Sequence, residues 1–365
     1  MDPKVILFSQ MPLPYSKIGS WSTLYDNYLR AEHGIDFLIC PKPENEEYLD
    51  IAYSYFNPQK TFLDKVLHKL KVTLPWHHAI AALKKVVQPE TKYIIHIIDN
   101  FGFCMALSAY LEKNGIRSNF YIHYFYHGFP SFKNEQLYSK VDELTLLTYK
   151  SYTEIKKNVN TFPCRISILH NGIDTSKFYP LPMLEKQDLR KSFKMEDKTV
   201  FVWCSQDRPK KGLPLILDAW KRIQTKHSNV ELLIIGTEKK QNAPGITYIG
   251  RVPNNQLARY YQMADVYLFS TLCQEGFPLS LTEALHCGCY CIASALGGVS
   301  EVLDEGKYGK LIDNPNFIDE WIIAITDYLN GDFENHPFPK ELYTKEIWNA
   351  AMNNLVQNSI KNLSP

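Results

Sequence analysis

The sequence contains no long hydrophobic run. No stretch of its 365 residues approaches the ~20 consecutive apolar residues that a membrane-spanning helix requires, although 45% of the chain is hydrophobic. The net charge is only +1, which excludes the strongly basic character of most nucleic-acid-binding proteins. The start, MDPKVILFSQMPLP, lacks the basic, apolar and small-residue segments of a secretory signal. We therefore expect a soluble, cytoplasmic protein that does not bind nucleic acid.

Motifs of several common protein classes are also missing. The eight cysteines are scattered and form no disulfide framework, so we expect free thiols. Cys287, Cys289 and Cys291 alternate along a predicted strand, but zinc sites use CxxC pairs on turns, so we interpret the three as buried packing residues and expect no metal site. No GxGxxG follows a predicted strand, and Glu305-Gly306-Lys307 lacks the glycine spacing and Ser/Thr of a P-loop. These absences exclude dehydrogenases and kinases.

Short apolar runs alternate with longer amphipathic stretches along the whole chain. Because the strands of a parallel sheet are buried on both faces, this alternation predicts βαβ units. The predicted strands of the first half are 5–8, 36–40, 93–98, 119–126 and 144–149. The rhythm restarts after residue 165, with strands at 199–204, 231–236, 247–250, 266–270 and 290–294 and a helix over 213–227. We predict an α/β protein of two doubly wound, Rossmann-like domains.

The domain boundary is predicted near residue 168, where an apolar run meets the turn signal Asn171-Gly172. We assign residues 1–168 to an N-terminal domain and residues 169–343 to a C-terminal domain. Residues 344–365 are predicted to form a terminal helix that packs back towards the N-terminal domain.

Residues 61–74 form an amphipathic helical pattern of their own. An apolar stripe runs from Phe62 to Leu74, lysines and histidines occupy the other faces, and Trp76 follows. Such a helix can lie on an anionic membrane surface, which makes residues 61–78 a candidate for peripheral membrane contact. We favour the alternative, a helix packed on its own sheet with a solvated basic face.

The densest signal lies between Ser270 and Glu301, where the pattern is strand, loop, helix, strand, glycine loop and helix. Glu275 falls in the first loop, at the carboxyl end of a strand, where open α/β sheets bind ligands. Glu283 stands eight residues later, inside the helix. Two such carboxylates can hold the hydroxyls at the two ends of a nucleotide sugar, whereas either glutamate alone would be interpreted as an ordinary surface residue.

Pro278 fits the first turn of the helix that carries Glu283. The N–H groups of Leu279 and Ser280 would then be unpaired and available to an anion. The diphosphate of a nucleotide sugar is an anion of the expected kind.

The segment EGFPLSLTE resembles the Glu-x7-Glu motif of the retaining glycosyltransferases of family four, which have the GT-B architecture of two facing Rossmann-like domains. ALHCGCYCIAS and GGVSE follow it in the family's order. ILHNGID at 168–174 is similar to the family's domain junction, and 247–270 is similar to the stretch that lines its base pocket. The resemblance covers most of residues 165–305 and is thinner in the N-terminal half.

The resemblance implies a role for each matching residue. Glu275 would hold sugar hydroxyls and stabilise positive charge at the anomeric carbon, and Glu283 would hold the ribose. Lys211 in SQDRPKKG matches the family's diphosphate-binding lysine. Arg208, with Lys210 as the alternative, would assist it, although the family's arginine commonly stands at the position of Gln206. The other donor-binding residues predicted in this half are Phe277, Pro278, Leu279 and Val252.

Two further candidates lie in the N-terminal half, which would bind the acceptor. Gly19 resembles the family's glycine loop after the first strand, where two adjacent glycines are usual and this chain has Gly19-Ser20. His127 follows the strand at 119–126 and resembles the family's histidine that faces the reacting sugar. His123, inside that strand, is the alternative, and we expect it to be packed.

The function that follows is transfer of a hexose-type sugar from a nucleoside diphosphate sugar to an acceptor hydroxyl, with retention, in surface polysaccharide or glycolipid synthesis. We expect no cofactor, and no metal because the chain has no Asp-x-Asp pair. The acceptor would be a saccharide or a lipid-linked sugar at the inner membrane face. The alternatives are a sugar-nucleotide 2-epimerase of the same fold, which needs no acceptor, and a non-catalytic nucleotide-sugar-binding subunit.

Overall fold

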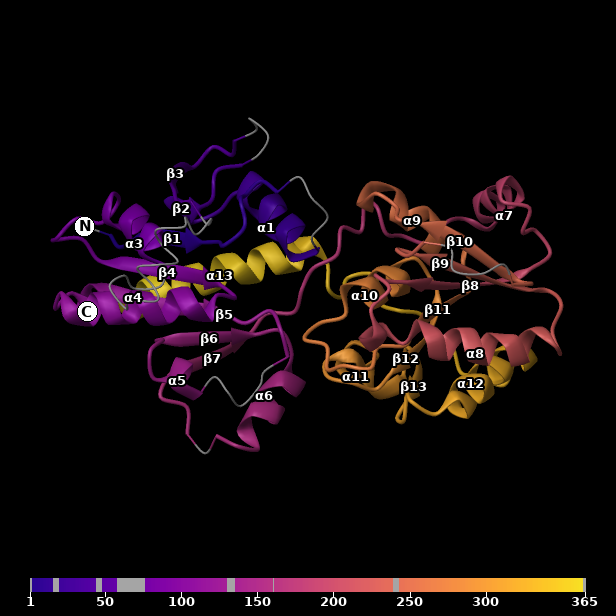
Figure 1. Cartoon of the computed structure of the whole chain (residues 1–365). Coiled ribbons are helices and arrows are strands. Elements are labelled where there is room, and N and C mark those ends of the chain that lie inside the picture. The colour runs from indigo at the N-terminus through magenta and orange to yellow at the C-terminus, as the bar shows by residue number, and fades with distance from the viewer. Residues whose placement is uncertain are drawn as a thin grey trace. The chain divides into compact units, whose positions relative to one another are not determined.

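The computed structural model describes residues 2–15, 20–43, 48–57, 76–129, 135–159, 161–238 and 243–363. The chain divides into two compact units (Figure 1). Unit 1 comprises Met1–Asn171 together with Glu346–Pro365, and unit 2 comprises Gly172–Lys345. Each unit is built on one parallel sheet.

In unit 1 the described residues form a seven-stranded sheet of order β3-β2-β1-β4-β5-β6-β7. Its strands are β1 (Lys4–Phe8), β2 (Phe37–Cys40), β3 (Ala52–Tyr55), β4 (Tyr93–Ile98), β5 (Phe120–Phe125), β6 (Glu143–Leu146) and β7 (Arg165–Ile168). Its helices are α1 (Ser20–Arg30), α3 (His77–Lys84), α4 (Phe101–Lys113), α5 (Glu135–Tyr138), α6 (Tyr149–Lys156) and α13 (Lys345–Leu363), with a short 3-10 turn at Arg117–Asn119.

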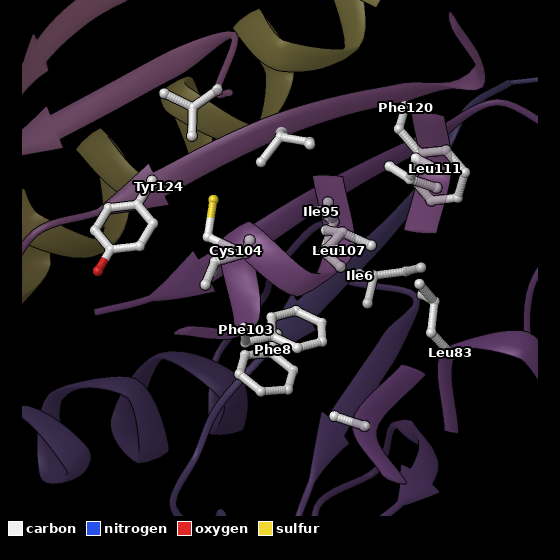
Figure 2. Close-up of a cluster of buried hydrophobic side chains, with 14 of the residues drawn as sticks. Ile6, Phe8, Leu83, Ile95, Phe103, Cys104, Leu107, Leu111, Phe120 and Tyr124 are labelled. Carbon is white, nitrogen blue, oxygen red and sulfur yellow. The ribbon is translucent and has the colours of Figure 1, made fainter. Parts of the chain in front are cut away.

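Alternation along β1 divides the core of unit 1 between two faces of the sheet. Ile6 and Phe8 point to one face, into a cluster with side chains of α3 and α4. Figure 2 shows this cluster, in which the ring of Phe8 stacks on that of Phe103 with 3.6 Å between centroids. Every residue of β4 is buried, as expected for a central strand covered on both sides.

The other face of the first sheet is covered by α1 and by α13, which comes from the far end of the sequence (Figure 1). Trp348, Met352 and Val356 of α13 are buried in this face of the core. The Trp348 ring meets Tyr25 and Tyr28 of α1 edge to face, at centroid distances of 5.3 Å and 5.6 Å. The C-terminal helix thus completes the core of unit 1.

Unit 2 contains, among its described residues, a six-stranded sheet of order β10-β9-β8-β11-β12-β13. Its strands are β8 (Thr199–Cys204), β9 (Val230–Ile235), β10 (Ile246–Gly250), β11 (Val266–Phe269), β12 (Tyr290–Ser294) and β13 (Gly309–Ile312). Its helices are α7 (Met183–Ser192), α8 (Leu213–Gln224), α9 (Asn254–Met263), α10 (Leu279–His286), α11 (Val299–Val302) and α12 (Ile318–Asn330), with 3-10 turns at Pro209–Lys211 and Asp304–Gly306.

The core of unit 2 depends on large aromatic residues. Trp203 of β8, Trp220 of α8 and Trp321 of α12 are almost fully buried in one cluster. Each buried indole N–H has an acceptor: Ser270 Oγ for Trp203, the Gly245 carbonyl for Trp220 and the Pro315 carbonyl for Trp321. The helices α8 and α12 are held on the sheet by this cluster.

The predicted α/β class with two doubly wound sheets is confirmed. The strand predicted at 144–149 is shorter, because Thr148 caps α6 by accepting the Ser151 N–H. Three short strands, β3, β7 and β13, were not predicted. None of the helices in the described part of the chain is long and apolar enough to cross a membrane.

The amphipathic pattern at 61–74 lies outside the described residues. Trp76, which follows it, packs edge to face against Phe8, Phe56 and Phe103 in the core of unit 1. Its ring therefore packs in the core. The membrane hypothesis had expected this aromatic ring at a lipid surface instead.

Replacing Trp348 by alanine should lower the free energy of unfolding of unit 1 by about 3–5 kcal/mol, since it opens a cavity beneath α13. Chemical denaturation followed by circular dichroism measures the effect. The control is Ile347→Ala, because Ile347 is 51% exposed and the change should stay within about 0.5 kcal/mol. Equal stability of the two variants would show that α13 adds nothing to this core.

Candidate donor-binding site

The strands β8 and β11 are neighbours at the point where the strand order of the second sheet reverses. From β8 the chain continues to β9 and β10 on one side, and from β11 it continues to β12 and β13 on the other. Open α/β sheets bind ligands at such a reversal, outside the carboxyl ends of the strands. Lys211 follows β8 and Glu275 follows β11, so both lie at this edge.

The loop after β8 is fastened to the loop after β11. Gly212 has a φ of +71°, and a Cβ at this position would lie 2.0 Å from the Ser270 carbonyl oxygen, so only glycine fits. Ser270 Oγ donates to the Lys211 carbonyl at 2.9 Å, and the Leu272 N–H donates to the Lys210 carbonyl at 2.7 Å. The main chain of Lys211 is fixed by these contacts.

Glu275 and Lys211 form an ion pair across the two loops. Lys211 Nζ lies 2.6 Å from Glu275 Oε1, and Thr271 Oγ1 donates to the same oxygen at 2.8 Å. The two charged side chains are only 23% and 18% exposed, so water screens the pair less than it screens a surface pair.

The predicted glycine loop of GGVSE, which contains Gly297 and Gly298, holds the main chain of Glu275. Gly297 forms a β-bridge with Glu275, and the Gly298 N–H donates to the Glu275 carbonyl at 2.8 Å. Gly297 has a φ of +65°, and a Cβ there would lie 2.3 Å from that carbonyl oxygen. The loop that begins α11 therefore needs glycine in order to approach Glu275.

Glu283 lies within α10 and differs from Glu275 in its surroundings. Burial raises the pKa of its carboxyl from 4.5 to about 8. Among the described residues, none donates a hydrogen bond to this carboxyl group or forms an ion pair with it. One turn earlier on the same helix, Ser280 Oγ accepts the Tyr267 hydroxyl at 3.0 Å. A carboxyl group with no partner in the described chain is a candidate to bind a ligand hydroxyl.

The start of α10 differs in one respect from the sequence-based expectation. Pro278 is the N-cap residue and α10 begins at Leu279, but the Leu279 N–H donates to the Phe277 carbonyl at 3.1 Å. The expectation of an unpaired Leu279 amide was therefore wrong, because the turn at Phe277 supplies an acceptor. The Pro278 carbonyl accepts the N–H groups of Leu281 and Thr282, so in the described first turn Ser280 is left without a backbone acceptor.

The remaining predicted donor-binding residues are distributed around these loops. The Phe277 ring is buried and meets Tyr343 edge to face at 5.2 Å. Val252 is half-buried, in the loop between β10 and α9. Arg208 is exposed, and its guanidinium group has no partner among the described residues. Arg208 stands next to the turn that carries Lys211, so its guanidinium group is available to pair with a bound anion.

His127 lies in unit 1, two residues after β5. Its Nε2 is 3.2 Å from the Tyr25 hydroxyl, and its ring lies 5.7 Å from that of Trp21. Burial lowers the pKa of His127 to about 4, so the ring is neutral near pH 7. Asp99, at the end of the neighbouring strand β4, accepts the His127 backbone N–H, and burial raises the pKa of this carboxyl.

The other N-terminal candidates differ in outcome. Gly19 lies outside the described residues. His123 is fully buried within β5, with its Nε2 2.6 Å from Thr145 Oγ1 and its Nδ1 3.3 Å from Ser359 Oγ of α13. Its side chain thus takes part in packing between the sheet and the terminal helix.

All eight cysteines have free thiols, and Cys287, Cys289 and Cys291 are buried. We expected the three to alternate along one strand, and they do not. Cys287 is the C-cap of α10, Gly288 reverses the chain with a φ of +84°, and β12 begins only at Tyr290. The helix extends further into HCGCYC than the apolar pattern indicated.

Sequence reasoning missed two partners of the predicted residues. Thr271 binds Glu275 from four residues before it, and Tyr25 binds His127 from α1. A hydroxyl residue close before a predicted catalytic carboxylate is a usable signal for Thr271. The pair of Tyr25 and His127 spans 102 residues and carries no local signal.

A family model described as "Glycosyl transferases group 1" matches residues 185–344, which lie wholly within unit 2. Among curated proteins, a phosphatidyl-myo-inositol mannosyltransferase of Mycolicibacterium smegmatis is 29% identical over 150 residues, 39% of this chain and 37% of the relative. A lipopolysaccharide 1,2-N-acetylglucosaminetransferase of Salmonella typhimurium is 26% identical over 206 residues, 50% of this chain and 53% of the relative. The matched part is thus about half of these relatives' length or less.

Solved structures extend the similarity to the whole chain. Sucrose-phosphate synthase of Thermosynechococcus elongatus has a TM-score of 0.73 at 17% identity, over 99% of this chain and 100% of that one. Anabaena HepE, solved in complex with UDP, has a TM-score of 0.70 at 15% identity, over 98% and 100%. At such identities the likeness shows the fold, which is GT-B. The match of residues 185–344 shows that unit 2 is similar to the group 1 glycosyl transferases.

Proposed function

We propose that this protein is a glycosyltransferase that moves a hexose-type sugar from a nucleoside diphosphate sugar to an acceptor hydroxyl. The observation that carries the proposal is the grouping of Lys211, Glu275 and Glu283 around the carboxyl ends of β8 and β11. A cation for the diphosphate, a carboxylate for the sugar and a partner-free carboxyl for the ribose together match the chemistry of such a donor. Unit 2 would bind the donor.

The leaving diphosphate needs positive charge, since breaking the anomeric bond moves negative charge onto the bridging oxygen. Lys211 would supply that charge from a fixed main chain, and the exposed Arg208 would add to it. The Ser280 amide, in the first turn of α10, would donate a hydrogen bond to a phosphate oxygen. These groups would make a metal ion unnecessary, so we expect a chelator to leave the rate unchanged.

Glu275 would bind hydroxyls of the sugar and stabilise positive charge at the anomeric carbon. Support comes from its main chain, which the glycine loop holds, and from its side chain, which Thr271 and Lys211 hold. Such a preorganised carboxylate needs little rearrangement when charge develops. Glu283 would accept the ribose hydroxyls, which donate best to an ionised carboxylate.

In unit 1, His127 would face the reacting sugar and the acceptor as a neutral ring. With Nε2 near the Tyr25 hydroxyl, it would act through hydrogen bonds without carrying charge. We propose retention of the anomeric configuration, with the leaving phosphate steering the proton of the acceptor hydroxyl. NMR of the product, which distinguishes the two anomers by their coupling constants, tests this step.

The acceptor would be a saccharide or a lipid-linked sugar in surface polysaccharide or glycolipid synthesis. The names of two relatives, one acting on phosphatidyl-myo-inositol and one on lipopolysaccharide, support this class. A lipid-linked acceptor would bring the protein to the cytoplasmic face of a membrane. The donor base is open between at least uracil and guanine, because HepE was solved with UDP-glucose and another relative is named GDP-mannose-dependent.

Replacing Glu275 by alanine should lower the rate of sugar transfer by about 10²- to 10³-fold, since a preorganised charge that stabilises the transition state is lost. Binding of the nucleoside diphosphate should persist. The measurement is the rate of nucleotide release from a panel of UDP- and GDP-sugars, in the presence and absence of acceptor glycans. A variant that transfers sugar as fast as the wild type would refute the role of Glu275.

The raised pKa of Glu283 makes the free protein less stable as pH increases. The neutral form is favoured in the folded state, so its contribution is fully present below pH 4.5 and is lost as pH rises through about 8. The melting temperature of the free wild type should therefore fall more between pH 5 and pH 8.5 than that of Glu283→Gln. Parallel pH profiles for wild type and Glu283→Gln would contradict the buried-carboxyl assignment.

A nucleoside diphosphate should raise the melting temperature of the wild type, and it should raise that of Glu283→Ala much less.

The lowered pKa of His127 predicts that its ring does not titrate within the working pH range. His127→Gln, which keeps a hydrogen-bonding side chain, should lower turnover without changing the shape of the rate profile between pH 5.5 and 8. The measurement is kcat against pH for the two proteins. An inflection near pH 6.5 in the wild type that disappears in the variant would show that His127 does titrate.

A further inference from the structure

One oxygen of Glu275 carries two interactions of different kinds. Oε1 receives the charged Lys211 Nζ at 2.6 Å and the neutral Thr271 hydroxyl at 2.8 Å. The thiol of Cys273 also faces this oxygen, at 3.8 Å, a distance too long for a strong hydrogen bond. Among the described residues, the second oxygen of Glu275 has no hydrogen-bond donor.

The two partners differ in how easily they can leave Glu275. Thr271 is 1% exposed and lies in the segment directly after β11, so its hydroxyl has little room to move. Lys211 has a fixed main chain but a flexible side chain of four methylene groups that is 23% exposed. A change of partner would therefore move the lysine and leave the threonine in place.

We propose that donor binding transfers Lys211 from Glu275 to the diphosphate, and that Thr271 is the positioning residue that then holds Glu275 against the sugar. The inference rests on the proposed function, because it assigns the order in which the donor-site residues change partners. A diphosphate carries more charge and more acceptor oxygens than one carboxylate, so it competes successfully for the ammonium group.

The exchange explains why Glu275 needs a neutral second donor. Once Lys211 has turned to the phosphate, the carboxylate would be free to rotate away unless another group held it. The Thr271 hydroxyl has no charge that a phosphate could attract. Its single hydrogen can reach the Glu275 carboxylate at 2.8 Å or the Cys273 carbonyl at 3.3 Å, and the closer, charged acceptor is favoured. The Thr271 hydroxyl leaves the second carboxylate oxygen available for a sugar hydroxyl.

The proposal predicts an unusual sign for a change at Glu275. Glu275→Gln removes the competitor for Lys211, so the affinity for a nucleoside diphosphate without sugar should rise about two- to fivefold, as expected for a pair of this strength. Turnover of the complete donor should fall in the same variant. Isothermal titration calorimetry with UDP and GDP measures the affinity.

A matched charge control separates this effect from a general gain of positive potential. Asp207→Asn removes one negative charge from the loop that carries Lys211, while the Lys211 side chain keeps its pair with Glu275. Its affinity for the nucleotide should change less than that of Glu275→Gln. An equal or larger rise in Asp207→Asn would overturn the exchange.

Thr271 is tested by substitutions of similar size. Thr271→Val should leave the affinity for the nucleoside diphosphate unchanged and lower kcat about tenfold or more with KM for the donor little changed. Thr271→Ser, which keeps the hydroxyl, should restore most of the activity. A merely structural role would instead lower the melting temperature and alter KM and kcat together.

Unit 2 offers a control for the threonine as well. Thr225, at the C-terminal end of α8, is exposed, and its Oγ1 donates to the Arg222 carbonyl at 2.7 Å. It lies outside every stretch assigned to the proposed site. Thr225→Val should leave kcat and nucleotide affinity unchanged.

The outcomes separate the inference from the function on which it rests. If the wild type binds no nucleoside diphosphate and transfers no sugar, the proposed function fails. If the wild type does both, but Glu275→Gln does not gain affinity or Thr271→Val is as active as the wild type, the exchange is overturned and the glycosyltransferase assignment stands.

Discussion

The pairing of β8 with β11 is the contact on which the proposed donor site depends. These strands are adjacent in space but separated in the chain by β9 and β10, and they pair in parallel, so both end at the same edge. A parallel crossover requires a long connection, which is why Lys211 and Glu275 are 64 residues apart and yet 2.6 Å from each other. Gly212 makes the approach possible, because any side chain there would meet the Ser270 carbonyl. Without that close contact the ion pair would have no fixed geometry.

In unit 1 an equivalent constraint is imposed from the far end of the chain. The sheet places polar residues in its interior: His96 and His123 are fully buried in β4 and β5, and Glu143 is nearly so in β6. Burial lowers the pKa of His123 to about 3, so its ring is neutral and can pack under a helix. The covering helix is α13, whose Ser359 lies within hydrogen-bond distance of His123. The strand that leads to His127 is thus buttressed by residues more than 200 positions away in the sequence.

The sequence predicted the central strands well, since continuous apolar runs such as YIIHII and TVFVWC are buried on both faces. The short strands β3, β7 and β13 escaped prediction because none of them has a continuous apolar run. The equally short β2 and β11 were predicted, because FLIC and VYLF are such runs. At the site, the chemical types of Lys211, Glu275 and Glu283 could be predicted from the motif. Their partners could not, since the Thr271 contact and the bridge to Gly297 depend on how loops from different strands meet. The Leu279 amide was misjudged for the same reason, because a local turn at Phe277 decides its partner.

The two glutamates of the site have the same chemistry and opposite environments. Glu275 is ion-paired and hydrogen-bonded before any ligand arrives, whereas the carboxyl group of Glu283 is desolvated and has no partner among the described residues. Two carboxyl groups in different surroundings can take different roles, as acid and base do in many enzymes. A carboxylate that its partners already hold in position needs little rearrangement in a transition state, and a desolvated one gains most when a ligand supplies hydroxyl donors. The proposed roles, with Glu275 at the sugar and Glu283 at the ribose, therefore rest on this difference in burial and pairing.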